Sequence, residues 1–130
     1  MYEQTTQSIR IAVTPIFLEE QSSPQEDRYV WAYRIRIENL GAQTVQLLNR
    51  HWKITDAQGH MQEVHGAGVV GEQPVLRPGE SYEYTSGAPL PTPSGMMVGS
   101  YEMVGEQGER FTVAIPAFSL DSPHETGRPN

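Results

Sequence analysis

The sequence contains no cysteine among its 130 residues. This absence excludes a disulfide-stabilised scaffold, a thiolate metal site and a cysteine nucleophile. A chain of this length suits one domain and buries roughly two-thirds of the surface that it exposes when unfolded. We therefore expect a fold that needs neither disulfides nor a structural metal, in a reducing compartment.

Basic residues are also scarce. Nine Lys and Arg against sixteen Asp and Glu give a net charge of -7, and Lys53 is the only lysine. Affinity for duplex nucleic acid depends on the neutralisation of phosphates by Lys and Arg, so we expect no nucleic acid duplex as a partner. The arginines are scattered along the chain, which also argues against a basic membrane-binding patch.

Long apolar runs are missing as well. The first ten residues, MYEQTTQSIR, have neither the basic nor the apolar part of a secretory signal. No stretch approaches the roughly 20 apolar residues of a membrane-spanning helix. We therefore expect a cytoplasmic protein with no membrane partner. Residues 1–130 are expected to form a single domain, with flexible tails at residues 1–7 and 121–130.

The pattern that the sequence does have is an alternation with a period of two residues, typical of β-strands. It is clearest in residues 28–38, where one face carries large aromatic or β-branched side chains and the other carries Arg34, Arg36 and Glu38. The first face consists of Tyr29, Trp31, Tyr33, Ile35 and Ile37. No window has a sustained helical period with caps. Seven or eight short strands separated by turns predict an all-β, antiparallel sandwich of the immunoglobulin or fibronectin type III type.

Three local features refine this prediction. The alternation changes phase within residues 44–55, which predicts a β-bulge near residues 47–49. Asp56 to His60 has the chemistry of a turn and should close a hairpin with the residues that follow. Three prolines within residues 87–95 predict a segment that is neither strand nor helix, and Pro116 should end the pairing of the last strand.

Several motifs together resemble the bacterial ApaG family. They are WKITD (52–56), GAGVVGEQP (66–74), PGESYEYTS (78–86), PSGMMVGSY (93–101) and IPAFSL (115–120). The resemblance extends over roughly residues 8–120. It implies a fibronectin type III-like sandwich that acts as a protein-interaction module, and a loose association with cobalt resistance and magnesium efflux. It implies neither a catalytic residue nor a cofactor.

Gly66, Gly68 and Gly71 reproduce the G-x-G-x-x-G spacing of dinucleotide-binding proteins. That motif needs a helix after the glycines, and Pro74 and Pro78 exclude one here. Flanking glutamates would also repel phosphate. We therefore interpret the motif as a loop that needs glycine for its backbone conformation. An alternative stays open, in which backbone N–H groups bind an anion and Arg50 or Arg77 adds positive charge.

Metal binding and catalysis have weaker signals. His51 and His65 would meet if their strands pair through the hairpin, and Glu63 could complete a site for a borderline metal such as cobalt. The plain alternative is surface histidines, and we assign no metal site. The acidic residues Glu63, Glu72, Glu80 and Glu83 would meet magnesium only weakly. No serine lies in a nucleophile motif, so we predict no enzyme and no cofactor.

The sequence thus predicts a non-enzymatic binding module for an unidentified protein partner, with homodimerisation through a sheet edge as a further possibility. The predicted binding loop comprises Arg50, Trp52, His65, Gly66, Gly68, Gly71 and Glu72. The alternative function is binding of a divalent metal, or of a nucleotide polyphosphate through the glycine-rich loop.

Overall fold

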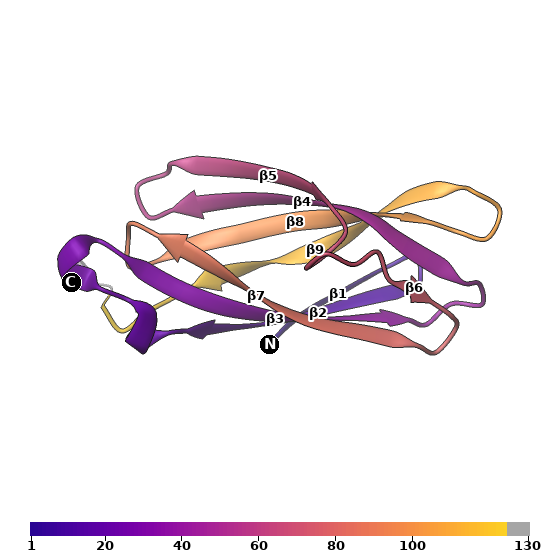
Figure 1. Ribbon diagram of the computed structural model, residues 1–130, viewed down its shortest axis with the longest axis horizontal. Coiled ribbons are helices and arrows are strands. Elements are labelled where there is room, and N and C mark those ends of the chain that lie inside the picture. Colours follow the sequence, from indigo (N-terminus) through magenta and orange to yellow (C-terminus); the bar gives the residue numbers. More distant parts are fainter. Residues whose placement is uncertain (125–130) are drawn as a thin grey trace.

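A computed structural model describes residues 1–124 and shows two antiparallel sheets packed face to face (Figure 1). The first sheet has the order β1 (Tyr2–Thr6), β2 (Ile9–Phe17), β3 (Tyr29–Asn39), β7 (Ser81–Leu90). The second has the order β5 (Met61–Ala67), β4 (Val45–Asp56), β8 (Gly95–Val104), β9 (Arg110–Leu120), and the short β6 (Val75–Leu76) pairs with β4. Two 3₁₀ turns, η1 (Glu19–Gln21) and η2 (Pro24–Glu26), connect β2 to β3.

The predicted all-β sandwich is confirmed. Residues 1–124 contain nine strands, more than the seven or eight expected, because β1 and the two-residue β6 add to the count. No helix in this part of the chain is long and apolar enough to cross a membrane.

The core forms where the apolar faces of the two sheets meet. All five aromatic and β-branched residues predicted on one face of β3 are buried, whereas Arg34 and Arg36 on the other face are exposed. The largest fully buried side chains are Trp31 from β3, Tyr101 from β8 and Phe118 from β9. Alternation along the strands therefore determines which side of each sheet faces the core.

The predicted phase change in β4 is confirmed as a register irregularity. The pairing of β4 with β8 shifts between Leu47 and Asn49. The extra residue allows both Leu47 and Trp52 to be buried although their spacing is odd. It also places Asn49 and His51 on the outward side of the second sheet. The hairpin through residues 56–60 is confirmed too, with His51 directly opposite His65.

Two predictions about proline were wrong. Residues 87–90 belong to β7, where Pro89 pairs with Val30, and β9 continues past Pro116 to Leu120. Both strands lie at sheet edges, where a residue without an N–H group can be accommodated. Opposite Pro116 the register of β8 and β9 also shifts, between Met97 and Gly99.

The expected flexible segment at residues 1–7 is instead largely a strand. Residues 2–6 form β1 and pair with β2, and the Tyr2 hydroxyl is 3.1 Å from Ser119 Oγ on the other sheet. The amphipathic side chain of Tyr2 explains why this segment forms a strand, because its ring packs with its centroid 6.0 Å from that of Phe118. The predicted tail at 121–130 is held at its start by a Trp31 Nε1–H bond to the Asp121 carbonyl, and residues 125–130 lie outside the described part.

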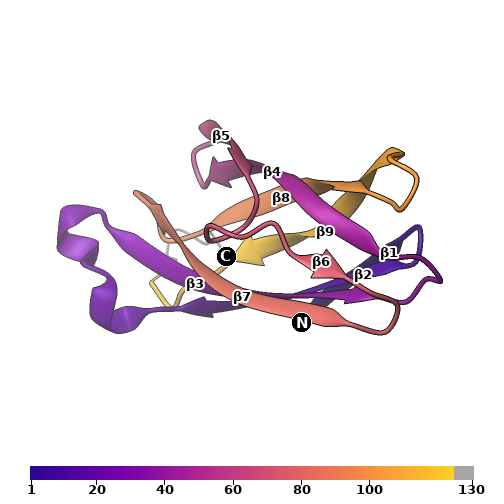
Figure 2. The same ribbon diagram turned by 45° about the vertical axis from the view of Figure 1, so that its right-hand side comes forward.

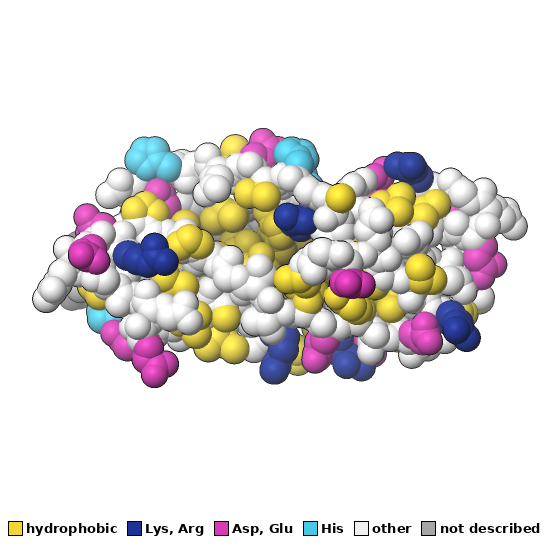
Figure 3. Space-filling view, viewed as in Figure 1, with side chains coloured by type: hydrophobic (Ala, Val, Ile, Leu, Met, Phe, Trp, Pro, Cys, Tyr) yellow, Lys and Arg dark blue, Asp and Glu magenta, His cyan; other side chains and the backbone are white. Residues whose placement is uncertain are grey.

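The two long sides of the sandwich differ. On one side β1 and β9 close it through the Tyr2 contacts and a bond from the Ala114 N–H to Thr6 Oγ1. On the other side β5 and β7 are free edges of their sheets (Figure 2). A hollow of about 270 Å³ lies between them, lined by hydrophobic side chains such as Ile54 and Val64 and by polar ones such as Arg50 and Gln62. Figure 3 shows hydrophobic side chains in the middle of this face.

Candidate functional site

The glycine-rich loop ends in a tight two-residue turn. The N–H of Val69 donates to the carbonyl of Glu72, and the N–H of Glu72 donates back to Val69. Val70 and Gly71 between them both have positive φ, 43° and 82°. This is the pattern of a type I′ turn, which suits glycine at 71 and is unusual for a β-branched residue at 70.

The other two glycines have their own structural reasons. Gly68 has a φ of +65°, and a Cβ there would lie 2.2 Å from the carbonyl oxygen of Glu72. Gly66 lies under the guanidinium of Arg50, where a Cβ would be 2.6 Å from Cζ. Glycine therefore allows close approach of backbone at 68 and positive φ at 68 and 71, and at 66 it leaves room for the flexible Arg50 side chain.

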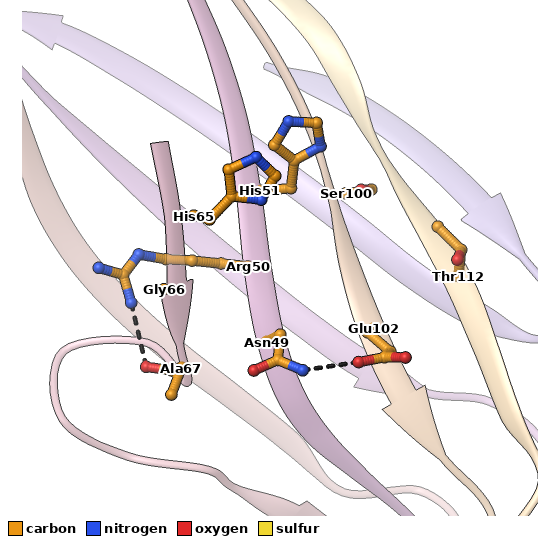
Figure 4. Close-up of a pocket in the computed structure, with 9 residues that line it drawn as sticks. All are labelled: Asn49, Arg50, His51, His65, Gly66, Ala67, Ser100, Glu102 and Thr112. Atoms are coloured by element: carbon orange, nitrogen blue, oxygen red, sulfur yellow. Dashed lines mark hydrogen bonds between the residues drawn. The ribbon is translucent and has the colours of Figure 1, made fainter. Parts of the chain in front are cut away.

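Arg50 organises this loop from the neighbouring strand. Its Nη1 donates to the carbonyl oxygen of Ala67 at 3.1 Å (Figure 4). The same nitrogen also donates to the carbonyl oxygen of Gly68 at 2.9 Å. The loop thus presents carbonyl oxygens, not N–H groups, to the positively charged guanidinium of Arg50. Three loop N–H groups, those of Gly68, Val69 and Glu72, donate to backbone carbonyls within the chain.

The helix that a dinucleotide-binding motif requires does not follow these glycines. Between the loop and β7 the chain forms only the short strand β6 and a turn, so no helix N-terminus faces the glycines. Arg77, considered above as a second cation, does not line the hollow beside the loop. The sequence-based interpretation of the motif as a structural glycine loop is therefore the one that the geometry supports.

Trp52 was wrongly predicted as a contact residue. Its side chain is buried in the core, with only 3% of its surface exposed. The indole packs edge-on against the rings of Tyr33 and Phe118, with centroid separations of 5.4 and 5.9 Å. The two-residue alternation along β4, which gives Trp52 the same parity as Ile54, places this side chain inward and favours the core position that the sequence also allowed.

The remaining predicted residues divide into two groups. Arg50, His65 and Gly66 line a hollow of about 510 Å³, whereas Gly68, Gly71 and Glu72 belong to the turn beyond it. The sequence had not indicated several further lining residues from β4, β8 and β9. These are Asn49, Ser100, Glu102 and Thr112 (Figure 4).

Polar contacts fix the β8 side of this hollow. Asn49 Nδ2 donates to Glu102 Oε1 at 2.6 Å, and Arg110 approaches the same oxygen at 3.5 Å. These contacts follow from the pairing of β4 with β8, which places Asn49 opposite Glu102. The bulge at residues 47–49 was the sequence signal for an outward Asn49, but no sequence pattern identified β8 as the neighbour of β4.

Two histidines and a glutamate lie at the β5 side of the hollow. Glu63 Oε2 is 2.6 Å from His51 Nε2 and 3.7 Å from His65 Nε2. The imidazole rings stack with centroids 4.2 Å apart. The hydrogen bond from His51, with the positive charge of neighbouring side chains, lowers the pKa of the Glu63 carboxyl below its ordinary value.

The same sheet surface continues into an apolar region. We call the side of β5, β4, β8 and β9 that faces away from the first sheet the outer face. Met96 and Val98 of β8 border a second hollow of about 660 Å³ on the outer face. They are 50% and 44% exposed, and Met61 of β5, in register with Thr55 like Met96, is 56% exposed.

Comparisons with known proteins agree with the family resemblance of the sequence motifs. The family model described as "ApaG domain" matches residues 19–105. Protein ApaG of Rhodospirillum centenum is 68% identical over all 130 residues of both chains, and that of Paramagnetospirillum magneticum is 67% identical over the same span. The crystal structure of the ApaA protein from Bordetella pertussis is 51% identical, with a TM-score of 0.87 over 90% of this chain and 95% of that one. The chain therefore belongs to the ApaG family.

Proposed function

We propose that the protein is a non-enzymatic binding module that recognises a protein partner with the outer face. The observation that carries this proposal is a group of exposed apolar side chains on β5 and β8, the two strands that flank β4 in one sheet: Met61, Met96 and Val98. Five other large hydrophobic side chains are exposed within residues 1–124, but they belong to other segments: Met1, Ile16, Leu40, Val70 and Val75.

The energetics of this surface favour association. Burying a Met or Val side chain contributes roughly 1.5–3 kcal/mol, so these three residues supply the apolar centre of an interface. The unbranched Met96 and Met61 adapt their shape to a partner. Polar and charged groups, including Lys53, Asp56 and Asp121, also line the hollow, which matches the usual polar rim around an apolar centre.

The side chains that line the hollow of about 510 Å³ support a non-enzymatic role. Ser100 lies opposite His51 in the β4–β8 pairing. Among the described residues no hydrogen bond joins this hydroxyl to the imidazole, and His51 Nε2 contacts Glu63 instead. An activated serine requires a base within hydrogen-bonding distance, so we assign no catalytic role to Ser100. We place the binding activity in the cytoplasm, as expected from the sequence.

Site-specific photo-crosslinking identifies the partner. A photoreactive amino acid at position 98 in living cells should give one reproducible adduct, which is then purified and its dissociation constant measured with the wild-type chain. Met96→Glu and Val98→Glu should each weaken binding by roughly tenfold or more, because a charge is buried at an apolar interface.

Val70→Glu is the matched comparison, since Val70 is 60% exposed and lies in the glycine-rich loop. Binding that is lost in Val70→Glu and retained in the two β8 variants would move the recognition site back to the loop. Sedimentation of the free protein at two concentrations tests the remaining possibility. A concentration-dependent dimer unaffected by Val98→Glu would indicate self-association through the free edges of β5 or β7 instead.

A further inference from the structure

Three side chains with metal-binding atoms converge on the outer face from two adjacent strands. His51 of β4 lies directly opposite His65 of β5, and Glu63 precedes His65 by two residues and so projects from the same side. One ligand atom from each residue lies within 4.8 Å of the other two. The topology of the hairpin, and not chance proximity of loops, brings these atoms together.

The ligand atoms of both histidines face one atom of Glu63. Both imidazoles present Nε2 to the same carboxylate oxygen, Glu63 Oε2, at 2.6 Å for His51 and 3.7 Å for His65. The side chains are 32%, 44% and 70% exposed for His51, Glu63 and His65, so an ion reaches them without any opening of the fold. The most exposed of the three, His65, has the freedom to close the remaining distance.

We infer that His51, Glu63 and His65 bind one divalent transition-metal ion of the zinc and nickel class. Two imidazoles and a carboxylate are ligands that these borderline ions prefer, whereas magnesium and calcium require oxygen ligands. Bond lengths near 2.0–2.2 Å require the two stacked rings, now 11° from parallel, to turn so that both Nε2 atoms face the ion. The ion takes the place of the proton now shared between His51 and Glu63, and solvent fills its remaining coordination positions.

Some of the surrounding charges weaken the attraction for a metal ion, and others strengthen it. Lys53 lies opposite Glu63 in the hairpin, and its positive charge weakens the attraction for a metal ion. The net charge of -7 on the whole chain opposes that effect. Arg50, which lines the same hollow as His51 and His65, keeps its positive charge while its guanidinium bonds the carbonyls of Ala67 and Gly68.

Calorimetric titration of the full chain with zinc chloride at pH 7.5 tests the inference, with magnesium chloride as the comparison ion. We expect one zinc ion per chain and no comparable magnesium binding. The variants H51Q, E63Q and H65Q should each weaken zinc binding roughly tenfold or more. The control H60Q changes a histidine of the same hairpin, 79% exposed and paired with Asp56, and should leave zinc binding unchanged.

Imidazole resonances in the NMR spectrum give a second readout that does not depend on mutation. Zinc should shift the resonances of His51 and His65 and leave those of His60 and His124 in place. Zinc binding that survives in all three cluster variants, that is lost equally in H60Q, or that never reaches one ion per chain would overturn the inference. Met96→Glu should retain zinc, so this result is independent of the proposed protein-binding function.

Discussion

The guanidinium of Arg50 lies directly on the backbone of Gly66, so that a Cβ at position 66 would be only 2.6 Å from Cζ. From this position Arg50 bonds two carbonyl oxygens of the loop that follows. The glycines that resemble a nucleotide-binding motif are therefore explained by one arginine and one tight turn. The three positions should differ in their tolerance of a side chain.

Alanine substitutions at the three glycines should separate these roles. Gly68→Ala should lower the free energy of unfolding most, by about 2–4 kcal/mol, because it combines positive φ with a clash against the Glu72 carbonyl. Gly71→Ala has open space and should cost about 1–2 kcal/mol for its positive φ alone. Gly66→Ala meets the end of a flexible side chain and should cost about 1 kcal/mol or less. Urea denaturation measures all three.

The order of these effects is the test. If Gly68→Ala is as stable as Gly66→Ala, the close contact with Glu72 is not a constraint on the folded loop. The same series shows that Gly68 variants report on folding as well as on binding, so Val70→Glu is the better probe of loop contacts.

Replacing Arg50 should loosen the loop. Arg50→Met keeps most of the apolar stem but removes both bonds to the carbonyls of Ala67 and Gly68, and we expect a loss of about 1–3 kcal/mol in the free energy of unfolding. Amide hydrogen exchange should accelerate within residues 67–72 more than elsewhere. Arg34→Met, at an exposed site on β3, is the control and should change stability by less than about 0.5 kcal/mol. Equal exchange rates in the two variants would contradict the role of Arg50.

Strand alternation made much of this fold predictable from the sequence. The face of β3, the bulge in β4 and the β4–β5 hairpin each have a local signature in two-residue periodicity or turn chemistry. The meeting of His51 with His65 followed from that hairpin alone. Local sequence patterns were less informative for proline. Whether a strand can contain proline depends on whether that strand lies at a sheet edge, which is a property of the whole topology.

Local sequence patterns could not predict which residues of β4, β8 and β9 line the candidate site. Asn49, Ser100, Glu102 and Thr112 come together because β4 pairs with β8 and β8 with β9. Nothing in the spacing of these residues distinguishes that strand order from others. Likewise, Trp52 was assigned to the surface because its motif is distinctive, although its parity with Ile54 indicated the core.

Three tyrosines predict how stability depends on alkaline pH. The hydroxyls of Tyr84 and Tyr101 hydrogen-bond to each other in the core, and burial raises the pKa of both groups and of Tyr33 above the ordinary value. The folded state therefore favours the neutral phenols. This stabilisation is fully present below the unfolded pKa of about 10 and is lost as the pH rises towards the folded values, by up to about 1.4 kcal/mol per pH unit for each group.

Urea denaturation between pH 8 and pH 11 measures this loss. Tyr101→Phe should lower stability by about 1–2 kcal/mol at pH 8, since it leaves the buried Tyr84 hydroxyl without its partner, and should flatten the alkaline decline. The double variant with Tyr84→Phe removes both hydroxyls and should recover part of that loss. A decline of unchanged steepness in the double variant would assign the alkaline sensitivity to other groups.

Among the side chains of the N-terminal strand, Tyr2 should contribute most to stability. Tyr2 packs against Phe118 and contacts Ser119 from the opposite sheet, whereas Glu3 beside it is exposed. Tyr2→Ala should lower the free energy of unfolding by about 1–2 kcal/mol, because the substitution removes a half-buried ring that bridges the two sheets. Glu3→Ala keeps the backbone pairing of β1 and should change stability by less than about 0.5 kcal/mol. Thermal and urea denaturation of the two variants distinguish a strand that closes the sandwich from a tail that merely lies on it, since in the second case both substitutions would be equally silent.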